Sequence, residues 1–271
     1  IFQFDPRSIN GETLTLSGIA DDITYIPLDN TILLNRIGSI YFNKSIIYLN
    51  SDNTGILTYR KDGQLINKIG TIGRGPEEYI NFRHFCVNDK SGNIYNLSNP
   101  RNLIQVFSPE GLFLRSFKLE SYISISGLLF FNDKLIAQCD PSPDNDYVWV
   151  AFDTLGSLLK KQVRHLPKFN VNYSSLNQSP YIFNNRLTYY NCWSDTIFSI
   201  TPALTEKPNL YICPGDFRYP RGVLSMNQLF EGNYLGYQIF ETINFFVFKY
   251  RFYKKYYLAF IDKNRKNSFG C

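Results

Sequence analysis

A strand–turn–strand unit that recurs about every 45 residues is the strongest constraint in this sequence of 271 residues. In each copy, two short runs rich in apolar, β-branched and aromatic residues flank a polar turn, which is the pattern of a β-hairpin. The turns centre near Gly63, Gly111, Gly156, Ala203 and Asn264, and the first three intervals are 48, 45 and 47 residues. A repeat of this length built from short strands predicts a β-propeller, in which each blade is a four-stranded sheet.

A second hairpin precedes most of these units and supplies the other two strands of a blade. Its turns fall at Ser91-Gly92, Asn132-Asp133 and Asn184-Asn185. In the downstream hairpin, Asp62-Gly63 predicts a type I′ turn, which needs positive φ at both central residues. A β-sandwich also uses such hairpins but does not explain the regular spacing. We therefore predict an all-β fold, a single propeller domain over residues 1–271 built from four-stranded antiparallel blades.

The glycine-rich segment "GTIGRGPEEY" at residues 70–79 raises the question of a phosphate-binding loop. A Walker loop ends in Lys-Ser or Lys-Thr, and a dinucleotide fingerprint opens a long helix, whereas the strand-like "INFRHFCVND" follows here. The segment lies after an outer strand and before an inner one. It must therefore cross from the rim of one blade toward the axis, and glycine permits the tight backbone of such a crossing.

Composition excludes several classes of protein. The hydrophobic content of 44% is too high for a disordered chain. The sequence contains no run of 18 apolar residues, so we predict no membrane-spanning helix. The five cysteines include no CxxC pair and there are two histidines, so we expect no metal site and no cofactor. Cys86, Cys139 and Cys192 stand among apolar neighbours, which predicts buried side chains.

The net charge of +5 comes mostly from the region between Lys249 and Lys266, where basic and aromatic residues interleave. Interleaved basic and aromatic residues are one pattern of nucleic-acid binding. A pair of strands with solvated lysines on one side accounts for the same pattern. We adopt that interpretation and expect no nucleic-acid partner. Helix signals are scarce, and the best short candidate is Arg221–Phe230.

Residues 66–117 resemble an NHL-type propeller repeat. More narrowly, nearly all of the chain is similar to the six-bladed β-propeller lipoproteins of Bacteroides-type bacteria. The segments that carry the resemblance are "IADDITYIPLDNT" (19–31), "IGSIYFNKSIIYLNS" (38–51), "GRGPEEY" (73–79) and "YNCWSDTIFSI" (190–200). The resemblance implies a propeller of the six-bladed type, located in the periplasm or at the cell surface and attached to the membrane only through a lipid anchor outside this chain.

Two features depart from that family. Glu77 stands where a glycine is expected ahead of the tyrosine of the glycine-rich segment, which leaves the segment less flexible. About five blade units are evident, and the last one looks incomplete. Propellers commonly close by pairing an N-terminal strand with the strands of the last blade. Residues 12–28 are our candidate for this closing strand.

Four polar residues near the crossing segment and one aromatic residue make up the ligand site that we predict: Arg74, Glu78, Arg83, His84 and Trp193. In this interpretation the polar residues bind an anionic or sugar ligand through charge-assisted hydrogen bonds, and the indole ring stacks on a sugar. The alternative is that Arg74 and Glu78 stabilise the crossing segment itself. Trp193 then packs in the core between blades.

The sequence contains no nucleophile elbow and gives no positive support for another catalytic constellation. We therefore predict an extracytoplasmic binding module without enzymatic activity. Its partner is an unknown protein or carbohydrate ligand, and its role is linked to glycan uptake or processing. The alternative function is that of a propeller hydrolase or lyase that acts on sugar-derived substrates.

Overall fold

The computed structural model describes most of the chain. The described residues are 15–18, 20–43, 45–52, 54–80, 82, 84–98, 103–120, 125–139, 146–165, 180–189, 194–212, 214–218, 236–252, 255–264 and 268–270. They form five four-stranded sheets in which every neighbouring pair of strands is antiparallel and follows the order of the sequence. This confirms the predicted all-β propeller with five evident blades. The described residues hold five blades, not six.

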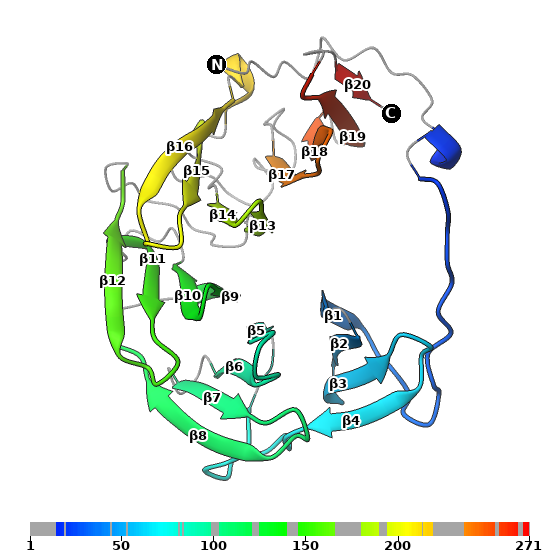
Figure 1. The fold of residues 1–271 in the computed structure, drawn as a ribbon, viewed down its shortest axis with the longest axis vertical. Coiled ribbons are helices and arrows are strands. Elements are labelled where there is room, and N and C mark those ends of the chain that lie inside the picture. The colour runs from blue at the N-terminus through cyan, green and yellow to red at the C-terminus, as the bar shows by residue number, and fades with distance from the viewer. Residues whose placement is uncertain are drawn as a thin grey trace. The chain divides into compact units, whose positions relative to one another are not determined.

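Contacts divide the chain into two compact units, and the larger contains residues 24–140 and 144–164. It holds three blades. The first blade comprises β1 (Ile37–Phe42), β2 (Ile46–Ser51), β3 (Gly55–Arg60) and β4 (Leu65–Ile69). The second blade comprises β5 (His84–Val87), β6 (Ile94–Ser98), β7 (Leu103–Phe107) and β8 (Phe113–Lys118). The third blade comprises β9 (Ile125–Phe131), β10 (Lys134–Cys139), β11 (Tyr147–Phe152) and β12 (Leu158–Val163). The first strands β1, β5 and β9 are neighbours, as blades fanned about a common edge require (Figure 1).

The other unit contains residues 1–23, 141–143 and 165–271 and holds two blades. The fourth blade comprises β13 (Tyr181–Phe183), β14 (Arg186–Tyr189), β15 (Thr196–Ile200) and β16 (Glu206–Tyr211); the fifth comprises β17 (Gly236–Glu241), β18 (Phe245–Phe252), β19 (Lys255–Asp262) and β20 (Ser268–Gly270). The fifth blade, predicted to be incomplete, thus has four strands, of which β20 is three residues long. The helices in the described part of the chain are the short 3₁₀ turns η1 (Leu16–Gly18) and η3 (Gly215–Phe217), and neither is long enough to cross a membrane.

The hairpins that join the first two strands of the third and fourth blades are two-residue turns. Asn132 and Asp133 have φ angles of 47° and 60°, and Asn184 and Asn185 have φ angles of 47° and 55°. Positive φ at both central residues defines the type I′ turn, and Asn and Asp tolerate the left-handed region better than other side chains do. The sequence prediction of hairpins at these two sites is confirmed.

The hairpin between β3 and β4 has a different geometry from the one predicted. Gly63 has a φ of 91°, whereas Asp62 is not in the positive region. The N–H of Gly63 donates to the Arg60 carbonyl at 3.0 Å, and the N–H of Arg60 donates to the Gln64 carbonyl at 2.9 Å. The predicted hairpin is confirmed but its predicted type I′ geometry is wrong, because three loop residues place the glycine alone in the left-handed region.

The same loop geometry recurs in the next two blades and fixes the step from blade to blade. Gly111 between β7 and β8 has a φ of 90°. Its carbonyl accepts the N–H of Gly70, at the end of the preceding blade, at 3.1 Å. A Cβ atom at Gly111 would lie 2.6 Å from the carbonyl oxygen of Lys68. Glycine is therefore required here both by its φ angle and by the close approach of the neighbouring backbone.

The segment that precedes the first blade contacts that blade in the same way. The carbonyl of Gly63 accepts the N–H of Asp29 at 2.9 Å, and a Cβ at Gly63 would lie 1.9 Å from the carbonyl oxygen of Pro27. Pro27 and Asp29 thus occupy the places that Lys68 and Gly70 take in the next step. Residues 27–29 lie where the end of an outermost strand lies in the following blade, although none of the described residues in 12–28 is assigned to a strand.

A closing role for residues 12–28 and a single domain over residues 1–271 stay predictions. The predicted helix Arg221–Phe230 lies outside the described residues.

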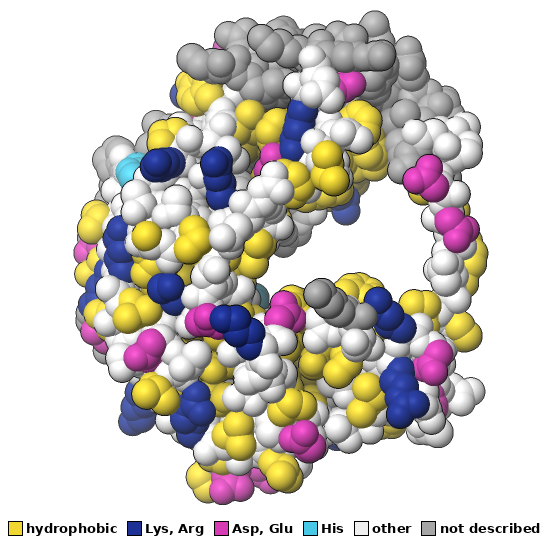
Figure 2. All heavy atoms as spheres, in the orientation of Figure 1, with side chains coloured by type: hydrophobic (Ala, Val, Ile, Leu, Met, Phe, Trp, Pro, Cys, Tyr) yellow, Lys and Arg dark blue, Asp and Glu magenta, His cyan; other side chains and the backbone are white. Residues whose placement is uncertain are grey.

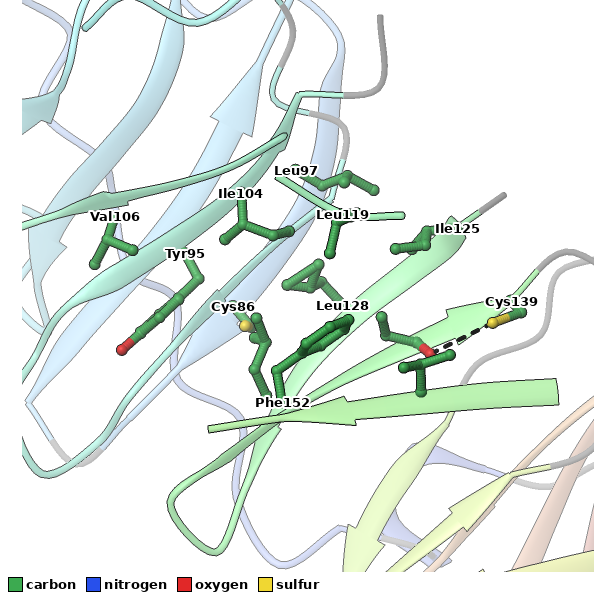
Figure 3. Close-up of a cluster of buried hydrophobic side chains, with 13 residues drawn as sticks. Cys86, Tyr95, Leu97, Ile104, Val106, Leu119, Ile125, Leu128, Cys139 and Phe152 are labelled. Carbon is green, nitrogen blue, oxygen red and sulfur yellow. Dashed lines mark hydrogen bonds between the residues drawn. The ribbon is translucent and has the colours of Figure 1, made fainter. Parts of the chain in front are cut away.

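The blades pack through their faces. Thirteen buried residues between the second and third blades form one cluster, which includes Tyr95, Leu128, Val150 and both thiols, Cys86 and Cys139 (Figure 3). Burial of both thiols confirms the prediction for these two cysteines, while Cys192 lies outside the described residues. A second cluster joins the first blade to the second. The middle strands of these blades are buried on both faces and read as short, largely apolar runs, whereas the outermost strands β4 and β8 alternate between exposed and more buried positions.

In the smaller unit, the corresponding cluster lies between the fourth and fifth blades. Its buried residues include Ile197, Ile212, Ile239, Phe248 and Ala259. The first strands of the two blades, β13 and β17, are neighbours. This packing brings the hairpin after β13 close to the end of β17, and the candidate site lies between them.

Candidate functional site

The glycine-rich crossing segment is held together by its own groups. The Glu78 carboxylate accepts the N–H of Gly75 at 2.7 Å, and the Tyr79 carbonyl accepts the N–H of Gly73 at 3.1 Å. A Cβ at Gly73 would lie 2.1 Å from the Glu78 carboxylate. The contacts of Glu78 thus match the alternative in which it stabilises the crossing. The side chain of Arg74 is exposed.

Tyr79 anchors the segment to the first blade. Its side chain is fully buried, its hydroxyl donates to the Ile69 carbonyl at 2.7 Å, and it accepts the N–H of Ile56 at 3.4 Å. Burial raises the pKa of Tyr79 to about 12. The carbonyls of Glu78 and Phe82 are also occupied, by the side-chain amides of Gln105 and Asn50 at 2.9 and 2.6 Å.

The structure describes three of the five predicted ligand residues, Arg74, Glu78 and His84. His84 is half-buried at the start of β5, a few residues after the crossing segment. Arg83 and Trp193 lie outside the described residues. A binding role for these five residues stays a prediction.

A cleft that the sequence did not indicate lies between the fourth and fifth blades. It has a volume of about 180 Å³ and is lined by Phe183, Asn184, Arg186, Thr188, Asn209 and Glu241. The β13–β14 hairpin supplies the first four, because its type I′ turn places residues on both sides of the turn against the fifth blade. Asn209 comes from β16 and Glu241 from the end of β17.

A hydrogen-bonded ion pair forms one wall of this cleft. The Glu241 carboxylate contacts the Lys263 ammonium at 2.7 Å and accepts the Tyr181 hydroxyl at 3.3 Å. The side chains of Lys263 and Glu241 are only 19% and 14% exposed, so little water competes for the pair. The Lys263 ammonium also lies 4.3 Å from the centre of the Phe183 ring and 5.0 Å from that of Phe246.

The surroundings of the Tyr181 phenol in this wall disfavour its ionisation. Burial, followed by the negative charge of Glu241, raises the pKa of Tyr181 well above its ordinary value of 10.0. The phenol therefore remains a donor, and the carboxylate orientation is fixed by two donors from opposite blades. A carboxylate oxygen can accept more than one hydrogen bond, so Glu241 retains acceptor capacity toward the cleft.

Arg186 supplies the accessible positive charge of the cleft. Its side chain is exposed at the start of β14, and no described group accepts a hydrogen bond from it. Asn209 is exposed and Thr188 is buried, so the lining offers amide and hydroxyl groups at two depths. The arrangement suits a small polar ligand with anionic character.

A second titratable cluster in the same unit is closed on itself. The Glu206 carboxylate bonds both the His165 ring and the Tyr189 hydroxyl, and the His165 ring stacks on Phe198 at 4.5 Å between centres. Both oxygens of Glu206 therefore have protein partners. In the part of the chain that the structure describes, no three His, Cys, Asp or Glu side chains are grouped as a metal site requires.

Sequence reasoning missed the cleft because its residues come from four strands and are spread along the sequence from Phe183 to Glu241. Of these residues, the sequence singles out only Asn184, as part of the Asn184-Asn185 hairpin turn and not as part of a binding site. A usable signal is the placement of Glu241 at the end of β17 and of Lys263 directly after β19, both strands being rich in aromatic and aliphatic residues. On the face of the molecule in Figure 2, basic side chains are scattered among acidic and apolar ones and form no single patch.

Solved structures of several bacterial proteins share this fold. A protein from Bacteroides fragilis that is described as exported is 19% identical, with a TM-score of 0.78 over 100% of this chain and 79% of that chain. A member of the DUF4221 family from Bacteroides vulgatus is 12% identical, with a TM-score of 0.55 over 90% and 83%. At these identities the likeness shows the fold alone.

Virginiamycin B lyase from Staphylococcus aureus is 10% identical, with a TM-score of 0.51 over 87% of this chain and 69% of that chain. The likeness therefore assigns no function to this chain, since one fold can carry unrelated functions. Among curated proteins, none matches the sequence. A family model described as "Domain of unknown function (DUF4934)" matches residues 1–270. Because the match spans almost the whole sequence, the chain belongs to the DUF4934 family.

Proposed function

We propose that this protein is an extracytoplasmic propeller module that binds a carbohydrate-derived ligand in the cleft between its fourth and fifth blades and serves glycan uptake or processing. One observation carries the proposal: the cleft combines a fixed, largely buried Glu241–Lys263 pair with exposed groups at Arg186 and Asn209. A wall whose polar groups are already oriented loses little freedom when a ligand binds. Convergent polar groups in a concave site are typical of small-molecule binding.

A binding screen tests this function. Purified protein is tested against a panel of neutral and acidic mono- and oligosaccharides by thermal shift, and the hits are measured by calorimetry. We expect at least one sugar to bind, and Asn209→Ala to weaken that binding several-fold, because an exposed amide is removed from the lining without opening the core. Failure of every sugar in the panel to bind would overturn the function.

The same measurement separates the cleft from the crossing segment. Arg74→Ala and His84→Ala remove residues of the site predicted from the sequence, in the other unit of the chain. If the cleft is the binding site, both variants bind like the unaltered protein. If they lose the ligand while Asn209→Ala retains it, the ligand binds at the crossing segment instead.

The proposed location includes a lipid anchor attached upstream of Ile1. Its support is the resemblance to propeller lipoproteins and the exported-protein description of the Bacteroides fragilis structure, and the latter belongs to that protein. Expression from the full reading frame with a labelled fatty acid tests the anchor. We expect the label in the protein and the protein in the membrane fraction, and an unlabelled protein in the cytoplasm would contradict both.

A further inference from the structure

Three features of the cleft, taken together, narrow the chemistry of its ligand: its size, its accessible charge and its mixture of polar groups. Its volume of about 180 Å³ is below the roughly 300–1,000 Å³ of pockets that hold drug-sized molecules. The ligand portion that enters it is therefore about the size of one sugar ring. Only part of a longer ligand would enter the cleft.

The charges in and beside the cleft do not cancel. Glu241 and Lys263 neutralise each other at 2.7 Å, and their burial keeps the pair together. Among the described residues, none pairs with the side chain of Arg186, and its charge faces solvent. Guanidinium groups bind carboxylates with two parallel hydrogen bonds, so an accessible Arg beside a neutralised wall favours a carboxylate ligand over a neutral one.

The remaining lining groups match hydroxyls. The Asn209 amide both donates and accepts, and the Glu241 carboxylate accepts from a donor on the ligand side while its orientation is held by Tyr181 and Lys263. Amide and carboxylate side chains together suit a molecule that presents several hydroxyls as donors and acceptors. A small aliphatic acid without hydroxyls would leave these groups unpaired, at a cost in affinity.

From this juxtaposition we propose that the cleft binds a sugar acid: a single-ring, hydroxylated carboxylate whose carboxyl group pairs with Arg186 and whose hydroxyls contact Asn209 and Glu241. This inference rests on the proposed function and adds the ligand class. It also assigns Arg186 as the residue that discriminates acidic from neutral sugars. Lys263 fixes the carboxylate of Glu241 and does not itself contact the ligand.

Calorimetry with four probes tests the ligand class on the whole 271-residue chain described above. The probes are galacturonate and glucuronate as acidic rings, glucose as a neutral ring, and acetate as a carboxylate without a ring. We expect at least one uronate to bind about tenfold or more tightly than glucose and acetate, because a hydrogen bond to a charged group contributes more than a neutral one. Added salt should weaken uronate binding and leave glucose binding unchanged.

Variants of Arg186 locate the discrimination. Arg186→Gln should reduce uronate affinity to the level of glucose, and Arg186→Lys should give an intermediate value because the charge stays while the bidentate geometry is lost. Arg74→Gln is the matched control, an exposed arginine in the other unit that should change nothing. Circular dichroism and thermal melts of each variant establish that the fold is retained.

The outcomes separate this inference from the proposed function. If glucose and the uronates bind equally and Arg186→Gln has no effect, the acidic ligand class is wrong while carbohydrate binding stands. If acetate binds as tightly as the uronates, the site recognises carboxylates and not sugar acids. If Arg74→Gln, and not Arg186→Gln, removes uronate binding, the ligand is acidic but the cleft is not its site. If no probe and no sugar of the screening panel binds, both proposals fail.

Discussion

The hydroxyl of Tyr79 is a single group on which the crossing between two blades depends. It is fully buried and bridges the Ile69 carbonyl and the Ile56 N–H, while its ring makes edge contacts with Phe82 and Phe107. Tyr79→Phe keeps the ring contacts and removes only the bridge. We expect the free energy of unfolding to fall by about 1–3 kcal/mol, the cost of leaving a buried polar group unpaired.

Urea denaturation measures this change, and Tyr25→Phe is its matched control. Tyr25 is 87% exposed, so losing its hydroxyl should alter the free energy of unfolding by less than about 0.5 kcal/mol. Equal effects of the two substitutions would show that the bridge contributes nothing to stability.

Residue identity predicted the turns well where glycine, asparagine or aspartate fills a left-handed position, and it located the turn less closely where leucine does. The fourth blade has the same loop as the earlier blades, with Leu204 donating its N–H to the Thr201 carbonyl at 2.8 Å. Leu204 has a φ of 59°, although leucine disfavours this region, and its side chain is buried. The sequence placed the turn centre at Ala203, one residue early, because leucine gives no turn signal.

Among the elements, the loop between β7 and β8 carries the step from the first blade to the second. Gly111→Ala places a methyl group 2.6 Å from the Lys68 carbonyl oxygen at a φ of 90°. Backbone cannot yield as a side-chain tip can, so we expect a loss of about 2–4 kcal/mol in the free energy of unfolding.

Gly215→Ala is the control for Gly111→Ala, because Gly215 also has a positive φ, of 55°, but nothing lies within 4 Å of its added Cβ. It should cost only the conformational penalty, about 1–2 kcal/mol. The denaturant midpoints of the two variants separate the cost of the steric contact at Gly111 from the cost of a positive φ at alanine. A smaller loss at Gly111 than at Gly215 would contradict the close approach.

The turn at residues 29–31, in the segment that precedes the first blade, depends on the charged side chain of Asp29. The backbone N–H and then the hydroxyl of Thr31 lower the pKa of Asp29 below its ordinary value of 3.8, and the N–H bond is 2.8 Å long. A lowered pKa in the folded state means that Asp29 stabilises the protein above pH 3.8 and that this stabilisation is lost as the pH falls through the folded-state pKa.

Asp29→Asn keeps the hydrogen-bond acceptor and removes the charge. The urea midpoint of the unaltered protein should exceed that of the variant at pH 6, and the difference should shrink as the pH falls toward about 2.5. A difference that grows on acidification would reverse the sign that we assign to this carboxylate.

The elements were predictable because their signals are local, whereas the cleft is not a local feature. Alternation and turn residues specify a hairpin within about 15 residues of sequence. The Tyr181–Glu241 contact spans 60 positions, and it forms because the faces of two blades pack. We predict a site at the glycine-rich crossing because its composition is unusual. In the structure, the carboxylate of Glu78 accepts a hydrogen bond from the N–H of Gly75 within the same segment.

For the molecule as a whole, stability depends on the apolar faces between blades, and two thiols report on one of these faces. Cys86 and Cys139 lie in the cluster between the second and third blades, and burial raises the pKa of the Cys86 thiol well above its ordinary value. Alkylation needs a solvated thiolate, so neither should react while these blades stay packed. Labelling with iodoacetamide at pH 8 and peptide mass spectrometry resolve each cysteine separately.

If the two blades open together, Cys86 and Cys139 share one opening equilibrium, and their labelling should accelerate in parallel as urea is added below the unfolding transition. Parallel slopes against urea would mean that both thiols require exposure of the same surface. Fast labelling of Cys86 in native buffer would contradict its burial, and a steeper slope for Cys139 would show that the third blade loosens separately. The comparison therefore tests whether neighbouring blades unfold as one cooperative body or one at a time.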